Sequence, residues 1–336
     1  MSILVVGSVA YDSVSTHQGS RQDALGGSAT YFSISASYFA PVSMVAVVGD
    51  DFKSEDLALL KAHRVDISGL RASPGRTFRW AGEYGQEDVN SRRTLDTQLN
   101  VFADFVPKLT PQQRRQPYLF LANIDPELQL NVLKQMEERP RLVAADTMNF
   151  WIEGKRETLT EVIKEVDVLL MDEYEVRLFA APYIKGVNVV RAARYILSLG
   201  PRMVIVKRGE HGVIQFMRED GHVAAVRPYT IFAAPAYPLE TVVDPTGAGD
   251  SFAGGLMGYL ASTGDLNPAA FRRATVVGSV MGSFAVESFS VERLRSLTRL
   301  DLTTRFREFT QLSHFDGLKE AEALPWRTEA ASAGGE

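Results

Sequence analysis

The chain has 336 residues, of which 45% are hydrophobic and 10% aromatic. This is enough to build one large α/β domain or two smaller ones. Lys and Arg total 36 against 41 Asp and Glu, so the formal charge is −5. A mildly acidic chain has no broad attraction to nucleic acid or to an anionic membrane. It contains no cysteine, which excludes disulfides, thiolate metal sites and cysteine nucleophiles.

The N-terminal residues 1–7 lack a basic segment and lead directly into an apolar strand, unlike a signal peptide. No apolar run approaches the length needed to cross a bilayer. We therefore expect a cytoplasmic protein.

Short apolar runs alternate with segments of helical periodicity along most of the chain. Strands are predicted at 3–7, 42–48, 118–122, 142–145, 168–171, 203–207 and 213–217, and the last two are a candidate hairpin. Helices are predicted at 28–39, 53–63, 126–138, 155–165, 173–180 and 188–199, and mostly helical structure at 247–312. Strands that alternate with helices predict a mostly parallel sheet covered on both faces.

Residues 70–102 have a different character. The stretch from Thr77 to Tyr84 alternates loosely between apolar and polar residues, and polar residues follow it. This pattern predicts a small, partly exposed β-element, which inside an α/β chain often forms a lid. Trp80 and Tyr84 either stack on a ring or pack the lid strands, and packing is the favoured interpretation because aromatic side chains usually serve as hydrophobic mass.

The stretch from Val242 to Gly255 carries the strongest chemical signal. We expect an apolar strand ending at Asp244, a tight turn at 247–249 and a helix to about residue 261. Such a turn leaves backbone N–H groups free at the positive end of a helix dipole, which suits a phosphate. Asp250 in the first turn of that helix is either a helix-capping acid or a general base that takes a proton from an attacking hydroxyl.

Two asparagines follow predicted strands at the carboxyl ends, where open α/β sheets bind ligands. Asn123 follows the strand at 118–122, and Asn149 closes the sequence Asp-Thr-Met-Asn after the strand at 142–145. Both are candidates for substrate binding. The five histidines show no metal-ligand spacing.

The sequence Asp-Pro-Thr-Gly-Ala-Gly-Asp at 244–250 resembles the C-terminal signature D-T-x-G-A-G-D of the ribokinase-like (PfkB) carbohydrate kinases, with Pro245 where threonine is frequent. Other stretches resemble landmarks of that family in the same order: Gly7 with Asp12, the Gly26-Gly27 pair, D-E-Y-E at 172–175 and V-K-R-G-E-H-G at 206–212. The resemblance covers about residues 3–290.

The resemblance implies a ribokinase-like, three-layer α/β/α fold with a mostly parallel central sheet and a small β lid. The kinase domain would occupy residues 1–324, with lid insertions near 12–20 and 70–102. Residues 325–336 are rich in glycine and alanine and are expected to form a disordered tail.

The implied activity is transfer of the γ-phosphate of ATP to a hydroxyl of a small sugar, nucleoside or related polyol. Asp250 would be the catalytic base, and the anion hole would consist of Gly247, Ala248 and Gly249. The acceptor would contact Asp12, Gly26, Gly27 and Ser28. The nucleotide would contact Asp172, Lys207, Gly209, Gly212, Gly247 and Gly249.

The resemblance also implies cofactors and an assembly. Glu175 would organise Mg²⁺ through water, and a monovalent cation is a further candidate. Lid strands that pair between two subunits would give a homodimer.

Several of these residues have a simpler interpretation. Asp12 is equally consistent with a turn cap, Glu175 with an acid at the positive end of a helix, and Lys207 with a solvated cation at a strand end. Asp172 replaces the usual asparagine of N-x-x-E and would repel phosphate unless a metal ion lay between them. Tyr31 stands where several sugar kinases of this type have asparagine, which weakens the case for ribose specifically.

Other functions are weighed against a kinase. A catalytically silent nucleotide-binding regulatory protein on the same fold is the main alternative, because fold alone does not establish catalysis. A dinucleotide-dependent oxidoreductase is disfavoured because Gly7 does not begin a G-x-G-x-x-G motif. A P-loop kinase is disfavoured because the chain has no G-x-x-x-x-G-K-[ST] sequence.

Overall fold

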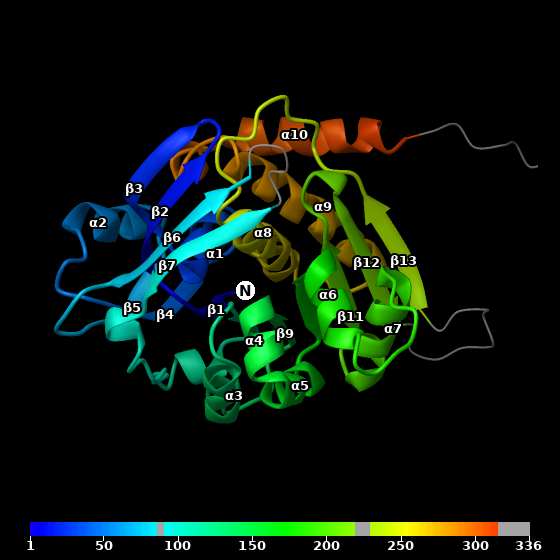
Figure 1. Cartoon of the computed structure of the whole chain (residues 1–336), viewed down its shortest axis with the longest axis horizontal. Coiled ribbons are helices and arrows are strands. Elements are labelled where there is room, and N and C mark those ends of the chain that lie inside the picture. Colours follow the sequence, from blue (N-terminus) through cyan, green and yellow to red (C-terminus); the bar gives the residue numbers. More distant parts are fainter. Residues whose placement is uncertain (86–90, 219–228, 315–336) are drawn as a thin grey trace, which may run out of the picture.

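The computed structural model describes residues 1–85, 91–218 and 229–314. Its body is a nine-stranded sheet in the order β13-β12-β11-β10-β9-β8-β1-β4-β5 (Figure 1). The strands are β1 (Ile3–Val6), β4 (Val42–Val48), β5 (Asp66–Ala72), β8 (Tyr118–Leu121), β9 (Leu142–Asp146), β10 (Val168–Asp172), β11 (Met203–Lys207), β12 (Val213–Arg218) and β13 (Tyr229–Ala234). The strands from β5 to β11 pair in parallel, and β12 and β13 join the edge antiparallel.

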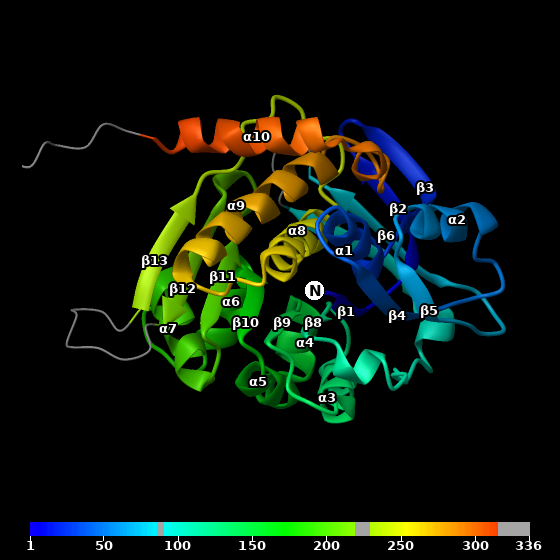
Figure 2. The ribbon, with the colours of Figure 1, turned by 180° about the vertical axis from the view of Figure 1, so that it is seen from behind.

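Helices cover both faces of this sheet (Figures 1 and 2). One side carries α1 (Ser28–Ser37), α8 (Ala248–Thr263), α9 (Pro268–Ala285) and α10 (Arg299–Leu312), with α2 (Ser54–Ala62) near the β5 edge. The other carries α3 (Pro126–Gln135), α4 (Asn149–Gly154), α5 (Arg156–Glu165), α6 (Glu173–Ala180) and α7 (Val189–Leu199). Short 3₁₀ helices are η1 (Asn100–Phe102), η2 (Gln113–Arg115), η3 (Gly209–His211) and η4 (Leu294–Ser296). No helix among the described residues is long and apolar enough to cross a membrane.

The central strands are apolar without interruption because both of their faces are buried. In β1, Ile3 and Val5 pack into the core beneath α1 and α8, whereas Leu4 and Val6 pack into the core on the opposite face. This arrangement confirms the predicted three-layer α/β fold with a mostly parallel sheet.

Most of the predicted elements are present, and the differences have local causes. The strand expected to end at Asp244 is wrong: this segment is irregular, and the Val243 N–H donates to the carbonyl of Val286 at 2.8 Å, beyond the end of α9. The prediction did not contain β5, β13 or α4. Helix α3 ends at Gln135, earlier than expected.

A second, four-stranded sheet forms the predicted lid, in the order β3 (Gly19–Gly26), β2 (Ala10–Thr16), β6 (Phe78–Tyr84) and β7 (Arg92–Gln98). The outer pairs are antiparallel, whereas β2 and β6 pair in parallel. The lid segment predicted near 70–102 begins after β5, because Ala72 still pairs with Val48 in the main sheet. The predicted tail at 325–336 lies outside the described residues.

The lid lies against the segment that leads into α8 (Figure 1). The Thr16 hydroxyl donates to the carbonyl of Val243 at 2.8 Å, and the Thr246 hydroxyl donates to the Tyr84 hydroxyl at 3.2 Å. Behind them, the Ser290 hydroxyl donates to the carbonyl of Leu25 at 2.5 Å. These contacts place the lid over the N-terminus of α8.

Replacing Phe120 with alanine tests the core that supports this end of the molecule. Phe120 on β8 stacks on Phe32 of α1 with ring centroids 4.2 Å apart, and both side chains are buried. Phe120→Ala should lower the free energy of unfolding by about 3–5 kcal/mol, as for other buried phenylalanines. Denaturant titration measures this, and Phe150→Ala is the control, because Phe150 is 62% exposed. A loss as small as that of the control would contradict the assignment.

Candidate active site

The turn before α8 is held in a conformation that requires glycine. Gly247 is the N-cap of α8 with φ 75°, in the left-handed region. A Cβ atom on Gly247 would lie 2.4 Å from the ring of Tyr31. Asp244 anchors the start of the turn, since its carboxylate accepts from the N–H of Thr246 at 2.9 Å and from that of Ser290 at 3.3 Å.

This turn presents backbone N–H groups at the positive end of α8. Ala248 is not free for the predicted anion hole, because its N–H donates to the carbonyl of Pro245 at 3.2 Å. In the described part of the chain, the N–H groups of Gly247 and Gly249 have no backbone acceptor. These two amides and the helix dipole form a cradle for negative charge.

Asp250 lies in the first turn of α8 and is partly buried. Burial, reinforced by the negative charge of Asp146, raises the pKa of Asp250 to about 7, while Lys207 and Arg92 oppose the shift. A carboxylate that titrates near neutrality can accept a proton at physiological pH and is chemically suited to general base catalysis.

A buried ion pair lies on the other side of the cradle. The Lys207 Nζ atom, at the end of β11, is 2.7 Å from the Asp146 Oδ2 atom at the end of β9, and these side chains are 19% and 4% exposed. A Cβ atom on Gly249 would lie 3.0 Å from the same ammonium. Burial alone would lower the pKa of Lys207, but the charges of Asp146 and Glu175 raise it above its usual range. Lys207 therefore carries its charge beside the cradle.

Asp146 was not among the predicted site residues. In the same loop, the sequence predicts Asn149 as the ligand-binding residue. The available signal was an acidic residue at the end of an otherwise apolar strand, where a buried carboxylate needs a partner. That partner is Lys207, two strands away in the sheet.

Asp172 and Glu175 form a capping box at the start of α6. The Glu175 N–H donates to Asp172 Oδ1, and the Asp172 N–H donates to Glu175 Oε2, both at 2.7 Å. Asp172 thus serves as a helix cap. Glu175 is buried, and this burial together with the charge of Asp172 raises its pKa to about 8.

Direct metal binding by protein side chains finds no support here. Among residues 1–85, 91–218 and 229–314, no group of three or more His, Cys, Asp or Glu side chains could hold a metal ion. A single buried carboxylate such as Glu175 fits a role through water molecules, as expected for a Mg²⁺ ion that keeps several of its waters.

Asp12 belongs to the lid strand β2 and forms the opposite wall of the site. A Cβ atom on Gly26 would lie 1.9 Å from Asp12 Oδ2, so this position requires glycine. Burial raises the pKa of Asp12 to about 7, the Gly27 N–H opposes the shift, and the charges of Asp244 and Asp250 reinforce it.

Two tyrosines complete the space between the lid and α8. Tyr31 is buried, and burial, then the charges of Asp12 and Asp244, raise its pKa well above its usual range. Burial also raises the pKa of Tyr84 to about 12. The Tyr31 ring therefore lies under the Gly247 turn with its hydroxyl exposed to the field of the site acids.

The remaining predicted residues have other contacts. The Ser28 hydroxyl lies 3.1 Å from that of Ser8, and the Asn123 side-chain oxygen accepts from Trp151 Nε1 at 3.1 Å. Asn149 begins α4. Gly209 and Gly212 form the turn between β11 and β12, both with positive φ, and their contact with nucleotide stays a prediction.

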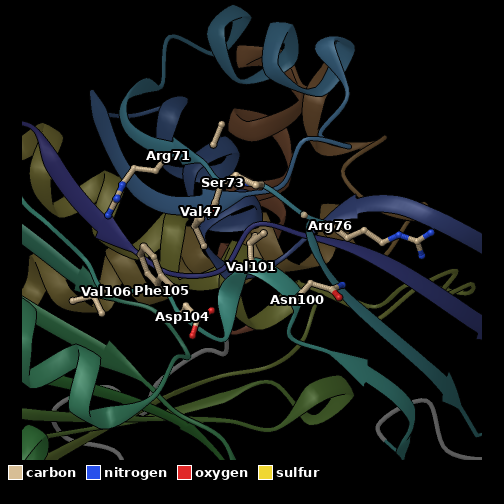
Figure 3. Close-up of a pocket in the computed structure, with 12 residues that line it drawn as sticks. Val47, Arg71, Ser73, Arg76, Asn100, Val101, Asp104, Phe105 and Val106 are labelled. Atoms are coloured by element: carbon tan, nitrogen blue, oxygen red, sulfur yellow. The ribbon is translucent and has the colours of Figure 1, made fainter.

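A separate cavity of about 340 Å³ lies at the base of the lid, where β4 and β5 end against η1 (Figure 3). Arg71 and Arg76 line it, but Figure 3 shows their side chains directed away from each other. They do not converge on a common ligand, so this cavity is not part of the candidate site.

A carboxylate beside an anion cradle is the arrangement that general base catalysis of phosphoryl transfer to an alcohol would need. The fold is that of the ribokinase-like kinases. The model of the pfkB family of carbohydrate kinases matches residues 2–290. The chain belongs to that family and is an ATP-dependent phosphotransferase with an alcohol acceptor.

Individual relatives agree with this assignment. A cytidine kinase from Thermococcus kodakarensis is 31% identical over 268 residues, covering 77% of this chain and 88% of that protein. The nucleoside kinase of Methanocaldococcus jannaschii, an archaeal member of the ribokinase family, superposes with a TM-score of 0.70 at 18% identity over 91% of this chain and 98% of its own. Burkholderia thailandensis nucleoside kinase, solved with inosine, gives a TM-score of 0.68 at 18% identity over 92% of this chain and 99% of its own. At these identities the two structures establish the fold.

Replacing Gly247 with alanine tests the strained turn. The added methyl group would be forced against the Tyr31 ring in a left-handed backbone conformation. Gly247→Ala should lower the free energy of unfolding by about 1–3 kcal/mol. Thermal or denaturant unfolding measures the change. The matched control is Gly154→Ala, because a Cβ atom on Gly154 meets nothing within 4 Å. Equal stability of the two variants would show that the turn is not constrained.

Proposed function

We propose that the protein transfers the γ-phosphoryl group of ATP to a hydroxyl of a small sugar, nucleoside or related polyol, and that a nucleoside is the preferred acceptor. The observation that carries the proposal is the position of Asp250, whose pKa is raised to about 7 beside the cradle and Lys207. The names of the relatives, a cytidine kinase and a nucleoside kinase, support a nucleoside acceptor.

In the proposed reaction, Asp250 takes the proton of the acceptor hydroxyl while the hydroxyl oxygen attacks the γ-phosphorus. The bond from the γ-phosphorus to its bridging oxygen breaks, and ADP leaves. The amides of Gly247 and Gly249 stabilise the charge on the transferring group, and Lys207 adds a positive charge beside them. Asp12 accepts hydrogen bonds from other hydroxyls of the acceptor. The lid excludes water that would otherwise hydrolyse ATP.

Kinases of this family use ATP with Mg²⁺. Bound to the phosphates, the metal ion supplies positive charge that offsets the charge of the transferring group. Glu175 would orient its water ligands, which is consistent with the absence of a direct metal cage in the described part of the chain. Dependence on a monovalent cation and a homodimer formed through the lid stay predictions.

Replacing Asp250 with asparagine removes the proposed base and keeps the size of the side chain. We expect kcat for phosphorylation of cytidine to fall by about a hundred- to ten-thousand-fold, with ATP binding retained. ADP release measures the rate, and calorimetry measures the binding. Asp301→Asn is the control, because Asp301 is also a first-turn acid but belongs to α10. A variant Asp250→Asn with nearly full activity would eliminate Asp250 as the base.

The pH dependence of the rate provides a second test. Asp250 accepts a proton only when it is ionised, and its pKa is raised to about 7 in the free enzyme. Therefore kcat/KM should rise with pH through about 7 and level off above it, because the ionised fraction rises in the same way. Initial rates from about pH 5.5 to about pH 8.5 measure the profile. The residual rate of Asp250→Asn should not show this rise, and the same rise in that variant would assign it to another group.

A protein that binds ATP but releases no ADP with any sugar, polyol or nucleoside would instead support the silent regulatory alternative.

A further inference from the structure

One face of the lid sheet faces the candidate active site. Strands β2 and β6 pair in parallel with Asp12 opposite Trp80, and residues opposite each other in register project from the same face. Tyr84, four positions further along β6, lies on this face too and contacts Thr246. Because both Asp12 and Tyr84 contact the site, Trp80 between them also faces it.

The Trp80 indole lies flat along this face instead of packing between lid strands. A Cβ atom on Gly82 would lie 2.3 Å from the six-membered ring of Trp80, so the indole crosses directly over the Gly82 backbone. The indole Nε1 donates to the Thr94 hydroxyl on β7 at 3.3 Å, and Thr94 is the register partner of Gly82. Trp80 is partly exposed and belongs to neither buried core cluster. Gly82 below the indole and Thr94 at its edge therefore fix the orientation of the partly exposed Trp80 ring.

The Arg92 guanidinium lies over the Trp80 ring. Arg92 is opposite Tyr84 in register, and its guanidinium carbon is 5.7 Å from the indole centre. Its charge also acts on Asp12 and Asp250 and opposes the rise in the pKa of each. Because the Arg92 side chain is exposed, it can move aside for a ring stacked on the indole and donate to an oxygen on the edge of that ring.

We propose that Trp80, supported by Gly82 and Thr94, is the specificity-determining residue that stacks on a planar heterocyclic base of the acceptor. This inference rests on the proposed kinase function and narrows its acceptor to nucleosides. The neighbouring Asp12 binds the sugar hydroxyls, and the base extends along β6 over Gly82. A free sugar reaches Asp12 but leaves the indole uncovered.

The test compares two acceptors and three variants. Cytidine has both sugar and base, whereas methyl β-D-ribofuranoside keeps the sugar hydroxyls and lacks the base. Trp80→Leu removes the ring, Trp80→Phe keeps a smaller one, and Glu83→Gln is the lid control, because Glu83 pairs with Arg93 on the opposite face of β6. Dissociation constants come from calorimetry, KM and kcat from ADP release, and thermal unfolding verifies that each variant is folded.

Stacking of one base on an aromatic side chain corresponds to about a 5- to 150-fold change in affinity. We expect Trp80→Leu to raise the dissociation constant and KM for cytidine by that factor, to change kcat little and to leave binding of the ribofuranoside unchanged. Trp80→Phe should recover part of the affinity, and Glu83→Gln should match the unaltered protein. Cytidine should also quench part of the tryptophan emission of the unaltered protein, but not that of Trp80→Phe.

Two results would overturn the proposal: cytidine affinity that does not change in Trp80→Leu, or an equal loss for cytidine and the ribofuranoside. The second result would make Trp80 a structural residue of the lid. The binding and quenching measurements need no turnover. An unaltered protein that binds cytidine through Trp80 but releases no ADP would therefore contradict the proposed kinase function and leave the stacking site established.

Discussion

The contact between the Gly247 turn and the Tyr31 ring is the constraint on which the site depends. A left-handed residue pressed against an aromatic face leaves room for glycine alone, and this conformation directs the free amides of the turn away from the core. Asp250 lies three residues after Gly247, so the same turn determines the position of the Asp250 carboxylate. Burying that carboxylate, and the Lys207–Asp146 pair beside it, has an energetic cost that a site built only for stability would avoid. The polar groups concentrated at this end of α8 are thus those expected of a catalytic centre.

The lid and the main domain meet on this same turn. Thr16 and Tyr84 reach from two lid strands to residues 243 and 246, immediately before the glycine. Movement of the lid therefore changes the surroundings of the amides and not only the access of water. Asp12, on the lid strand β2, also connects the lid with the main domain, because the charge of Asp250 raises the pKa of the Asp12 carboxyl group. In the proposed mechanism, these few side chains would couple acceptor binding and lid position to the protonation of Asp250.

Sequence reasoning found the local features and missed those that depend on packing. The Gly-Ala-Gly-Asp turn and the apolar central strands have signatures confined to a few consecutive residues. The partnership of Asp146 with Lys207 joins residues that are far apart in the chain and meet only once the sheet is formed. Val242 and Val243 have the composition of a strand, but the end of α9 provides the hydrogen-bond acceptor that a neighbouring strand would otherwise supply. The orientation of the Trp80 ring depends on a glycine two residues along and a threonine on another strand, which composition does not reveal.

The parallel pairing of β2 with β6 has a consequence for how the protein folds. Parallel neighbours need a crossover, and here the connection between them passes through the lid strand β3 and then through α1, β4, α2 and β5, which belong to the main body. The β2–β6 pair that joins the two halves of the lid therefore cannot form early from local contacts. This pair should become protected from hydrogen exchange only after the β1-β4-β5 edge of the large sheet has assembled, because closing so long a loop is unfavourable until that scaffold exists. The catalytic cover would be among the last parts of the molecule to be completed, so that an incompletely folded chain lacks a closed site.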